Sequence, residues 1–201
     1  MKNIFRTGAA SAAIVMALGM GSAVQAAEAS ADAKVEVLKP LSLEKTADMD
    51  FGAVAVNGSG TATLDFDADG AGELTCSADI VCVGTSNLAG FRVFGGSAGR
   101  TVGVTLPAAI DLVHSAPADP ANPTNAEVIE LGGYTTNADA TNTFDTDGTT
   151  ILSTSYSVDL GALGDADEGE ATFDLGGTIS FDGSEIAGEY TGTFTVSVEY
   201  I

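Results

Sequence analysis

Residues 188–201 of the chain read GEYTGTFTVSVEYI and carry the clearest structural pattern in the sequence. Apolar and aromatic residues stand at alternate positions, and threonine, serine or glutamate fills most of the positions between them. A period of two places the two sets on opposite faces of a β-strand. The apolar set is Tyr190, Phe194, Val196, Val198 and Tyr200. The pattern predicts a half-buried terminal strand, and a terminal strand can form a sheet edge that pairs with another chain.

Short runs of the same kind recur along the chain, separated by Gly, Asn-Gly and Asp-Gly turns, and helical periodicity is nearly absent after residue 27. Further strands are predicted at residues 53–56, 61–66, 91–94, 101–106, 127–131, 151–160, 171–175 and 177–181. Many short strands with regular turns are typical of a β-sandwich. The sequence therefore predicts an all-β fold, a single immunoglobulin-like β-sandwich over residues 38–201.

The N-terminus has the features of a secretory signal peptide over residues 1–26. Lys2 and Arg6 precede a small apolar stretch, and Val24 and Ala26, the third and first residues before the cut, suit cleavage between residues 26 and 27. An uncleaved membrane anchor is the alternative, because residues 8–27 could roughly span a bilayer. No later segment is long and apolar enough to do so. The mature protein is thus expected to be exported through the periplasm to the cell surface or beyond.

The charge excludes two classes of partner. The chain has 28 acidic and seven basic residues and a formal net charge of −21. Nucleic acids and anionic membrane surfaces are bound by clustered basic residues, and the sequence has no such cluster. It has no Lys or Arg after Arg100. Divalent cations and basic molecules remain as expected partners.

Cys76 and Cys82 are the only cysteines. An oxidising compartment favours a disulfide between them, within a hairpin or tight loop. The spacing is not that of a redox motif, and His114 is the only histidine, so a zinc site is not predicted.

Two further motifs suggest chemistry. Residues 95–99 match G-x-S-x-G around Ser97, with Asp111 and His114 downstream, as in α/β-hydrolases. That motif requires a strand-to-helix turn, and here strands are predicted on both sides. We therefore predict a glycine-rich turn and no enzymatic activity.

The acidic stretch 65–70 matches the opening of a calcium-binding loop. Its candidate ligands are Asp65, Asp67, Asp69 and Glu73. Cys76 stands where such a loop has its bidentate glutamate. An acidic hairpin turn and a weak calcium site both remain possible interpretations, and no other cofactor is predicted.

Pro117, Pro120 and Pro123 recur at every third residue. This spacing suits a polyproline II ligand, but an exposed loop crossing the domain is the favoured interpretation.

Several short motifs follow one another in a familiar order. They are LSLEK at 41–45, MDFG at 49–52, F-x-V-x-G at 91–95, TLP at 105–107 and G-x-Y-x-G-T-F at 188–194, with Gly188 fourteenth from the end. The ordered set resembles a family of secreted bacterial domains similar to chaperone–usher pilus subunits of the archaic, spore-coat-protein-U-like branch. The resemblance implies an incomplete sandwich that lacks one strand. A periplasmic chaperone would fill the gap first, and the N-terminal extension of the next subunit would then replace it at the outer-membrane usher.

In that scheme Gly188 and the apolar residues of the last strand form the chaperone-binding and polymerisation edge. Residues 27–37 are the candidate donor strand, because apolar residues alternate there. They are Ala29, Ala31, Ala33, Val35 and Val37. Alanines bury little apolar area, so a flexible leader before an ordinary first strand is the alternative.

The expected function is a structural subunit of a surface pilus or fimbria, assembled by donor-strand exchange, with a role in adhesion or biofilm. The alternative is a monomeric secreted or surface β-sandwich that binds a ligand, with calcium in its acidic loops.

Overall fold

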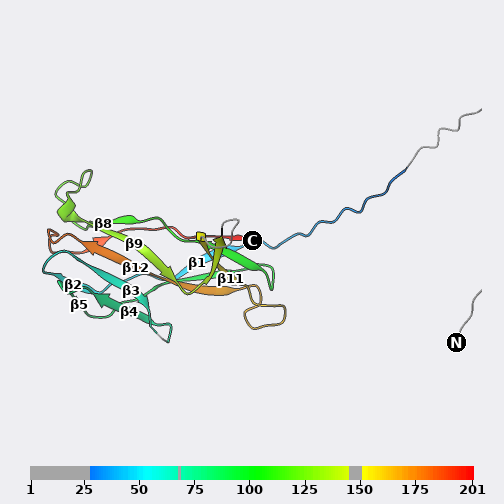
Figure 1. The fold of residues 1–201 in the computed structure, drawn as a ribbon, viewed down its shortest axis with the longest axis horizontal. Coiled ribbons are helices and arrows are strands. Elements are labelled where there is room, and N and C mark those ends of the chain that lie inside the picture. Colours follow the sequence, from blue (N-terminus) through cyan, green and yellow to red (C-terminus); the bar gives the residue numbers. More distant parts are fainter. Residues whose placement is uncertain (1–27, 68, 145–150) are drawn as a thin grey trace, which may run out of the picture. The chain divides into compact units, whose positions relative to one another are not determined.

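The structure is a computed structural model that describes residues 28–67, 69–144 and 151–201. The strand β12 (Ala171–Phe181) runs through the middle of its largest sheet (Figure 1). Four of its odd-numbered side chains are buried: Phe173 and Leu175 in one half, Ile179 and Phe181 in the other. The strands predicted at 171–175 and 177–181 are therefore one strand, which corrects the prediction. The Gly176–Gly177 pair does not interrupt it, and a Cβ atom at residue 176 would lie 2.2 Å from the carbonyl oxygen of Leu64.

Three antiparallel sheets make up the fold. The eight-stranded sheet has the order β1-β6-β12-β9-β8-β13, and β3 pairs with both β12 and β4. Its strands besides β12 are β1 (Ser42–Ala47), β3 (Gly60–Phe66), β4 (Gly72–Cys76), β6 (Ala89–Phe94), β8 (Ile110–His114), β9 (Val128–Thr136) and β13 (Tyr190–Thr191).

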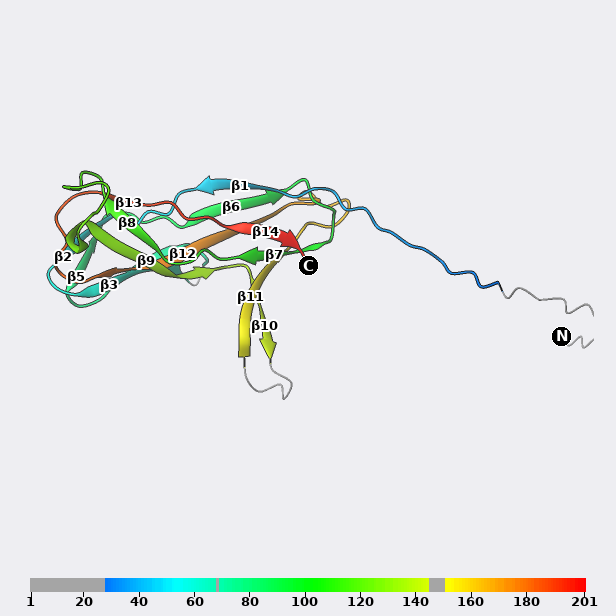
Figure 2. The same cartoon turned by 90° about the horizontal axis from the view of Figure 1, so that it is seen from above.

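The second sheet has four strands in the order β10-β11-β7-β14, and the third has two. The four are β7 (Thr101–Thr105), β10 (Asp139–Phe144), β11 (Ile151–Asp159) and β14 (Ser197–Tyr200). The two-stranded sheet pairs β2 (Ala53–Val56) with β5 (Ile80–Val83). Figure 2 shows the β10–β11 hairpin extending away from the other strands. A 3-10 turn, η1 (Asn125–Glu127), is the only helical element in the described residues.

Two hydrophobic clusters form the core. The first contains Phe173 and Leu175 of β12 with valines of β6 and β7, and the rings of Phe91 and Phe173 stack 5.3 Å apart. The second contains Ile179 and Phe181 with residues of β3, β5 and β9. The all-β, sandwich-like fold predicted from the sequence is confirmed. No helix in the described part of the chain is long and apolar enough to cross a bilayer.

The predicted disulfide between Cys76 and Cys82 is present. Of the hairpin or tight loop predicted around it, the structure has the tight loop: the N–H of Ile80 donates to the carbonyl of Ser77, and β4 pairs with β3 in the large sheet whereas β5 pairs with β2. The disulfide therefore links the large sheet to the two-stranded one.

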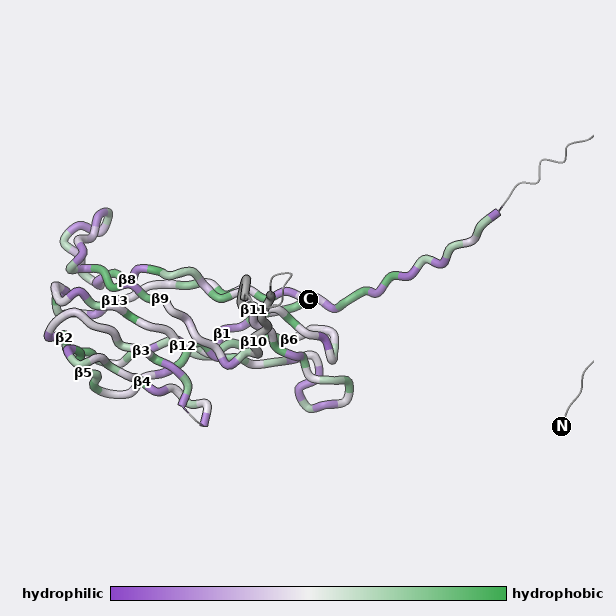
Figure 3. The backbone as a smooth tube through the Cα atoms, viewed as in Figure 1, coloured by the Kyte–Doolittle hydropathy of each residue, from purple (hydrophilic) through white to green (hydrophobic). Residues whose placement is uncertain are grey.

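The chain divides into two compact units, residues 1–36 and residues 37–201. The signal peptide predicted at 1–26 lies outside the described residues. In the first unit, residues 28–36 form no strand. Figure 3 shows hydrophilic and hydrophobic residues alternating along this segment.

Candidate functional site

The last residues of the chain have the predicted alternation of faces. Val196 is buried, and the other four apolar residues are half-buried: Tyr190, Phe194, Val198 and Tyr200. The residues at 191, 193, 195, 197 and 199 are all exposed. Val196 belongs to the first core cluster, and Phe194 packs against both clusters. The inward face of this segment thus closes the core.

The single strand predicted over 190–200 is not continuous. β13 pairs with β8 at the edge of the large sheet, and β14 pairs with β7 at the edge of the four-stranded sheet. Between them, residues 192–196 make no backbone–backbone hydrogen bond to any described residue. The side chains keep a period of two because the chain stays extended while it passes from one sheet to the other.

One edge of the terminal segment, residues 189–201, carries all of its strand pairing. Ser115 donates its backbone N–H to the carbonyl of Glu189 at 2.7 Å, and Ile201 donates to Thr101 at 3.4 Å. Backbone groups alternate in direction along a strand, so the backbone N–H and C=O groups of the odd-numbered residues point toward β8 and β7. Val198 and Tyr200 therefore direct their backbone N–H and C=O groups to the opposite edge. No strand of the described residues pairs there.

Apolar side chains from the start of the domain approach this segment. Met49 packs against both core clusters, as Phe194 does. A Cβ atom on Gly96 would lie 3.0 Å from Leu41 and 3.1 Å from the hydroxyl of Tyr200. We call these half-buried residues the terminal seam: Leu41, Leu43 and Met49 from the first part of the domain, and Phe194, Val198 and Tyr200 from the last. β1 and β14, which flank it, are both edge strands.

Three hydrogen bonds join the ends of the domain. The Tyr200 hydroxyl accepts the backbone N–H of Ser97 and donates to the carbonyl of Lys39, both at 2.8 Å. The Lys39 N–H donates to the hydroxyl oxygen of Ser97 at 2.9 Å. We call this arrangement the Lys39–Ser97–Tyr200 junction. Ser97 lies in the predicted glycine-rich turn, between β6 and β7.

The structure does not bring Ser97 and His114 together as a hydrolase would. His114 instead packs edge-on against Tyr190, with ring centroids 5.2 Å apart, and its Nδ1 accepts the backbone N–H of Ala116. A Cβ atom on Gly188 would lie 1.9 Å from the Nε2 of His114. Glycine at 188 therefore leaves room for the imidazole ring.

Tyr190 fixes the beginning of the terminal segment. Its hydroxyl group is 2.8 Å from the carbonyl oxygens of both Ala126 and Ile186. Burial raises the pKa of Tyr190, and the nearby carboxylate of Glu185 raises it further. A neutral phenol can donate a hydrogen bond to one carbonyl, so this side chain stays a donor at physiological pH.

The proline-bearing segment forms a loop, as favoured from the sequence. Asp119 to Asn122 is a β-turn with Pro120 at its second position, because the N–H of Asn122 donates to the Asp119 carbonyl. The loop is held by the buried carboxylate of Glu127, which accepts the N–H groups of Ala118 and Thr124 and the hydroxyl of Thr124.

β3 and β4 form an antiparallel hairpin, with Asp65 on β3 and Asp67 in the connection between the two strands. The carboxylate of Asp67 accepts the backbone N–H groups of Asp69 and Ala71 at 2.9 and 2.8 Å. Asp65 and Glu73 are cross-strand neighbours. In the described ranges no three His, Cys, Asp or Glu side chains are placed to hold a metal ion. The four candidate calcium ligands are thus not brought together.

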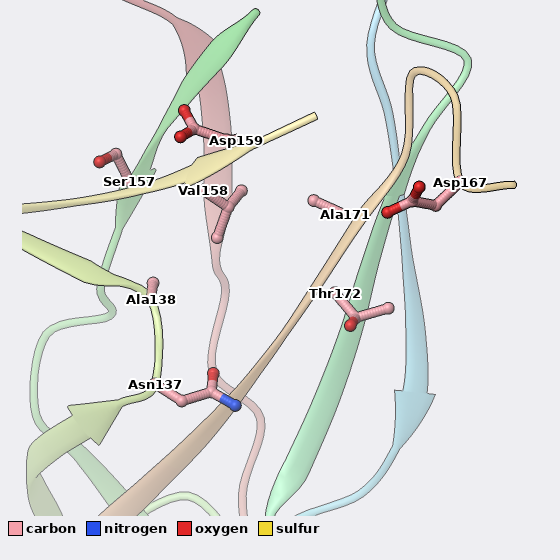
Figure 4. A pocket seen from close by; sticks show the side chains of 8 residues that line it. All are labelled: Asn137, Ala138, Ser157, Val158, Asp159, Asp167, Ala171 and Thr172. Atoms are coloured by element: carbon pink, nitrogen blue, oxygen red, sulfur yellow. The ribbon is translucent and has the colours of Figure 1, made fainter. Parts of the chain in front are cut away.

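An open surface cavity of about 390 Å³ lies between β11 and β12 (Figure 4). Two carboxylates line it, Asp159 from β11 and Asp167 from the loop before β12. The hydroxyl of Thr101 donates to Asp159 at 2.6 Å. This cavity is not among the sites predicted from the sequence.

Sequence reasoning missed Glu127 and Lys39. The pattern Thr124-x-x-Glu127 matches a helix-start capping box and could have drawn attention to the glutamate. Lys39 carries no such signal, because its bonds to the junction use only backbone atoms.

A sequence model of the family described as "Domain of unknown function (DUF4402)" matches residues 41–200 of this chain. No curated protein and no solved structure matches the chain. The matched range begins just before β1 and ends with β14, so it contains every strand of the described residues. The chain therefore belongs to the family of the DUF4402 domain.

Proposed function

We propose that the mature chain is a structural subunit of a surface pilus or fimbria that polymerises by donor-strand exchange and takes part in adhesion or biofilm. Residues 27–37 of one copy add to the terminal segment of another. The partners are neighbouring subunits, a periplasmic chaperone and an outer-membrane usher. The protein is exported and is not an enzyme.

The unpaired edge of the terminal segment carries the proposal. Residues 189–201 pair on one side only, and residues 192–196 lack backbone partners on both sides within the described part of the chain. Unpaired strand edges are templates for an added strand. Most native edge strands are blunted by charged side chains or bulges, whereas the inward positions here are aromatic or valine.

The terminal seam supplies the apolar side of the interaction. Its six side chains are only half-buried, although all pack against a core cluster. An added strand that lies between β1 and β14 would cover them. Among the residues of the donor candidate, Val35 and Val37 have the largest apolar side chains and are 84% and 87% exposed. Burying a valine side chain contributes about 1.5–3 kcal/mol, so these two dominate over the alanines.

The experiment is size-exclusion chromatography with light scattering on mature protein purified from the periplasm, with and without residues 27–37. We expect the full chain to form polymers or a chaperone complex, and the shortened chain to form no polymers. If both the full and the shortened chain are monomers that unfold cooperatively, the proposal is contradicted and a self-sufficient binding protein is favoured.

A further inference from the structure

The Lys39–Ser97–Tyr200 junction fixes the backbone just after the candidate donor strand. Both polar groups of the Lys39 backbone are bonded, the N–H to Ser97 and the C=O to Tyr200. Pro40 follows directly, so its ring holds its own φ near −65° and restricts Lys39 to extended backbone. Lys39 is therefore held both by its partners and by its sequence neighbour.

Only Leu38 separates the junction from Val37, the last residue of the candidate donor strand. Two extended residues span at most about 7 Å. A donor strand whose last residue, Val37, is bound in the neighbouring copy must therefore reach the junction of the domain it comes from within that distance. The two domains would be joined by almost no free chain.

We propose that the Lys39–Ser97–Tyr200 junction makes the joint between consecutive copies short and stiff, and that the Gly95–Gly99 turn contacts the copy that receives the donor strand. The inference rests on the proposed function. It gives the G-x-S-x-G motif a role as the anchor of the inter-subunit link. The partner at this surface is a second copy of the chain.

Fibre stiffness tests the proposal. The variants are S97A/Y200F, which removes the anchoring hydroxyls and keeps the aromatic ring, and an insertion of Gly-Ser-Gly-Ser between Leu38 and Lys39. The matched control is T63V. It removes a hydroxyl whose hydrogen bond to the Thr178 hydroxyl is 3.0 Å long. This pair does not belong to the junction. Persistence lengths are measured by electron microscopy of assembled fibres.

We expect both variants to form fibres whose persistence length is shorter by about threefold or more, because flexible linkers decouple the bodies they join. T63V should match the wild type. Hydrogen exchange at the Lys39 amide of S97A/Y200F should be faster by about twofold to tenfold, which is the change expected from losing one hydrogen bond.

The insertion keeps all three hydrogen bonds, so it tests the short joint even if S97A/Y200F folds poorly. Fibres of unchanged stiffness in the insertion variant, or in a folded S97A/Y200F, would overturn the joint while leaving donor-strand exchange intact. A wild-type chain that forms no fibres in the presence of its chaperone and usher would overturn both.

Discussion

The hydroxyl of Tyr200 donates a hydrogen bond to the carbonyl oxygen of Lys39 at 2.8 Å. The penultimate residue of the chain is thereby bonded to a residue that closely follows the candidate donor strand. The root of the extension and the end of the free edge thus lie at the same end of the domain.

The direction of backbone groups on β14 gives a sharp test of strand addition. The N–H of Val198 points to the free edge, whereas that of Glu199 points to β7. We expect V198P to stay folded and to bind a peptide of residues 27–38 at least about tenfold more weakly. Proline has no backbone N–H, so residue 198 can no longer donate a hydrogen bond to the added strand. E199P should lower the unfolding midpoint more than V198P does, since it removes a ladder hydrogen bond.

Calorimetric titration and thermal melts of the two variants, each lacking residues 27–37, provide these values. Equal peptide affinity for V198P and the parent chain would contradict the assigned edge.

Gly188 is required by the ring of His114. A Cβ atom at 188 would lie 1.9 Å from Nε2, so the ring or the backbone must move. We expect G188A to lower the free energy of unfolding by about 1–3 kcal/mol, as overpacking does. The double variant G188A/H114A should recover part of the loss relative to H114A alone. Urea denaturation of the four proteins measures this coupling, and strictly additive effects would refute the explanation.

Glu127 makes loop stability depend on pH. Hydrogen bonds from the N–H of Ala118, then from the N–H and hydroxyl of Thr124, hold the pKa of Glu127 below its ordinary value of 4.5. A lowered pKa in the folded state means stabilisation that is present above pH 4.5 and is lost as the pH falls through the folded value. We expect E127Q to lower the melting temperature by about 2–4 °C at pH 7 and to have a smaller effect near pH 2.5.

E130Q is the matched control, because Glu130 is exposed on β9, the strand that directly follows η1. It removes the same charge from an acidic protein without touching the loop. Differential scanning calorimetry at both pH values separates the two effects. If E127Q and E130Q behaved alike at pH 7, Glu127 would not organise the loop.

The disulfide closes a short loop between two sheets, with a sequence separation of six. Loop-closure entropy predicts that C76A/C82A unfolds with a free energy lower by about 2 kcal/mol. Chemical denaturation with and without reductant measures the loss. The wild type should respond to reductant, and the variant should not. An unchanged wild-type curve under reducing conditions, with both thiols free, would be the contrary result.

Alternating hydrophobicity was sufficient to predict which residues face the core. Phe173, Leu175, Ile179 and Phe181 of β12 and Val196 before β14 are all buried as the period of two requires. The pairing of strands could not be read in the same way. β2 pairs with β5, and β14 with β7, through contacts between distant residues, and alternation carries no information about neighbours.

The break in the terminal strand shows the same limit. Phe194 and Val196 keep their inward face while the backbone leaves β8 and has not yet reached β7. The sequence pattern is therefore identical for a paired and an unpaired backbone. Polar anchors are also invisible to hydrophobic periodicity. Ser97 matched a catalytic motif by its neighbours, but its partners, Lys39 and Tyr200, are 58 and 103 residues away.

Direct binding of the donor segment is the most decisive measurement. A peptide of residues 27–38 is added to the domain that begins at residue 38, and V35D/V37D peptide serves as the control. Donor-strand addition predicts saturable binding, a higher melting temperature and slower hydrogen exchange at the amides of Val198 and Tyr200, with none of these for the control. A stable monomer that shows no binding to either peptide at millimolar concentration would contradict it.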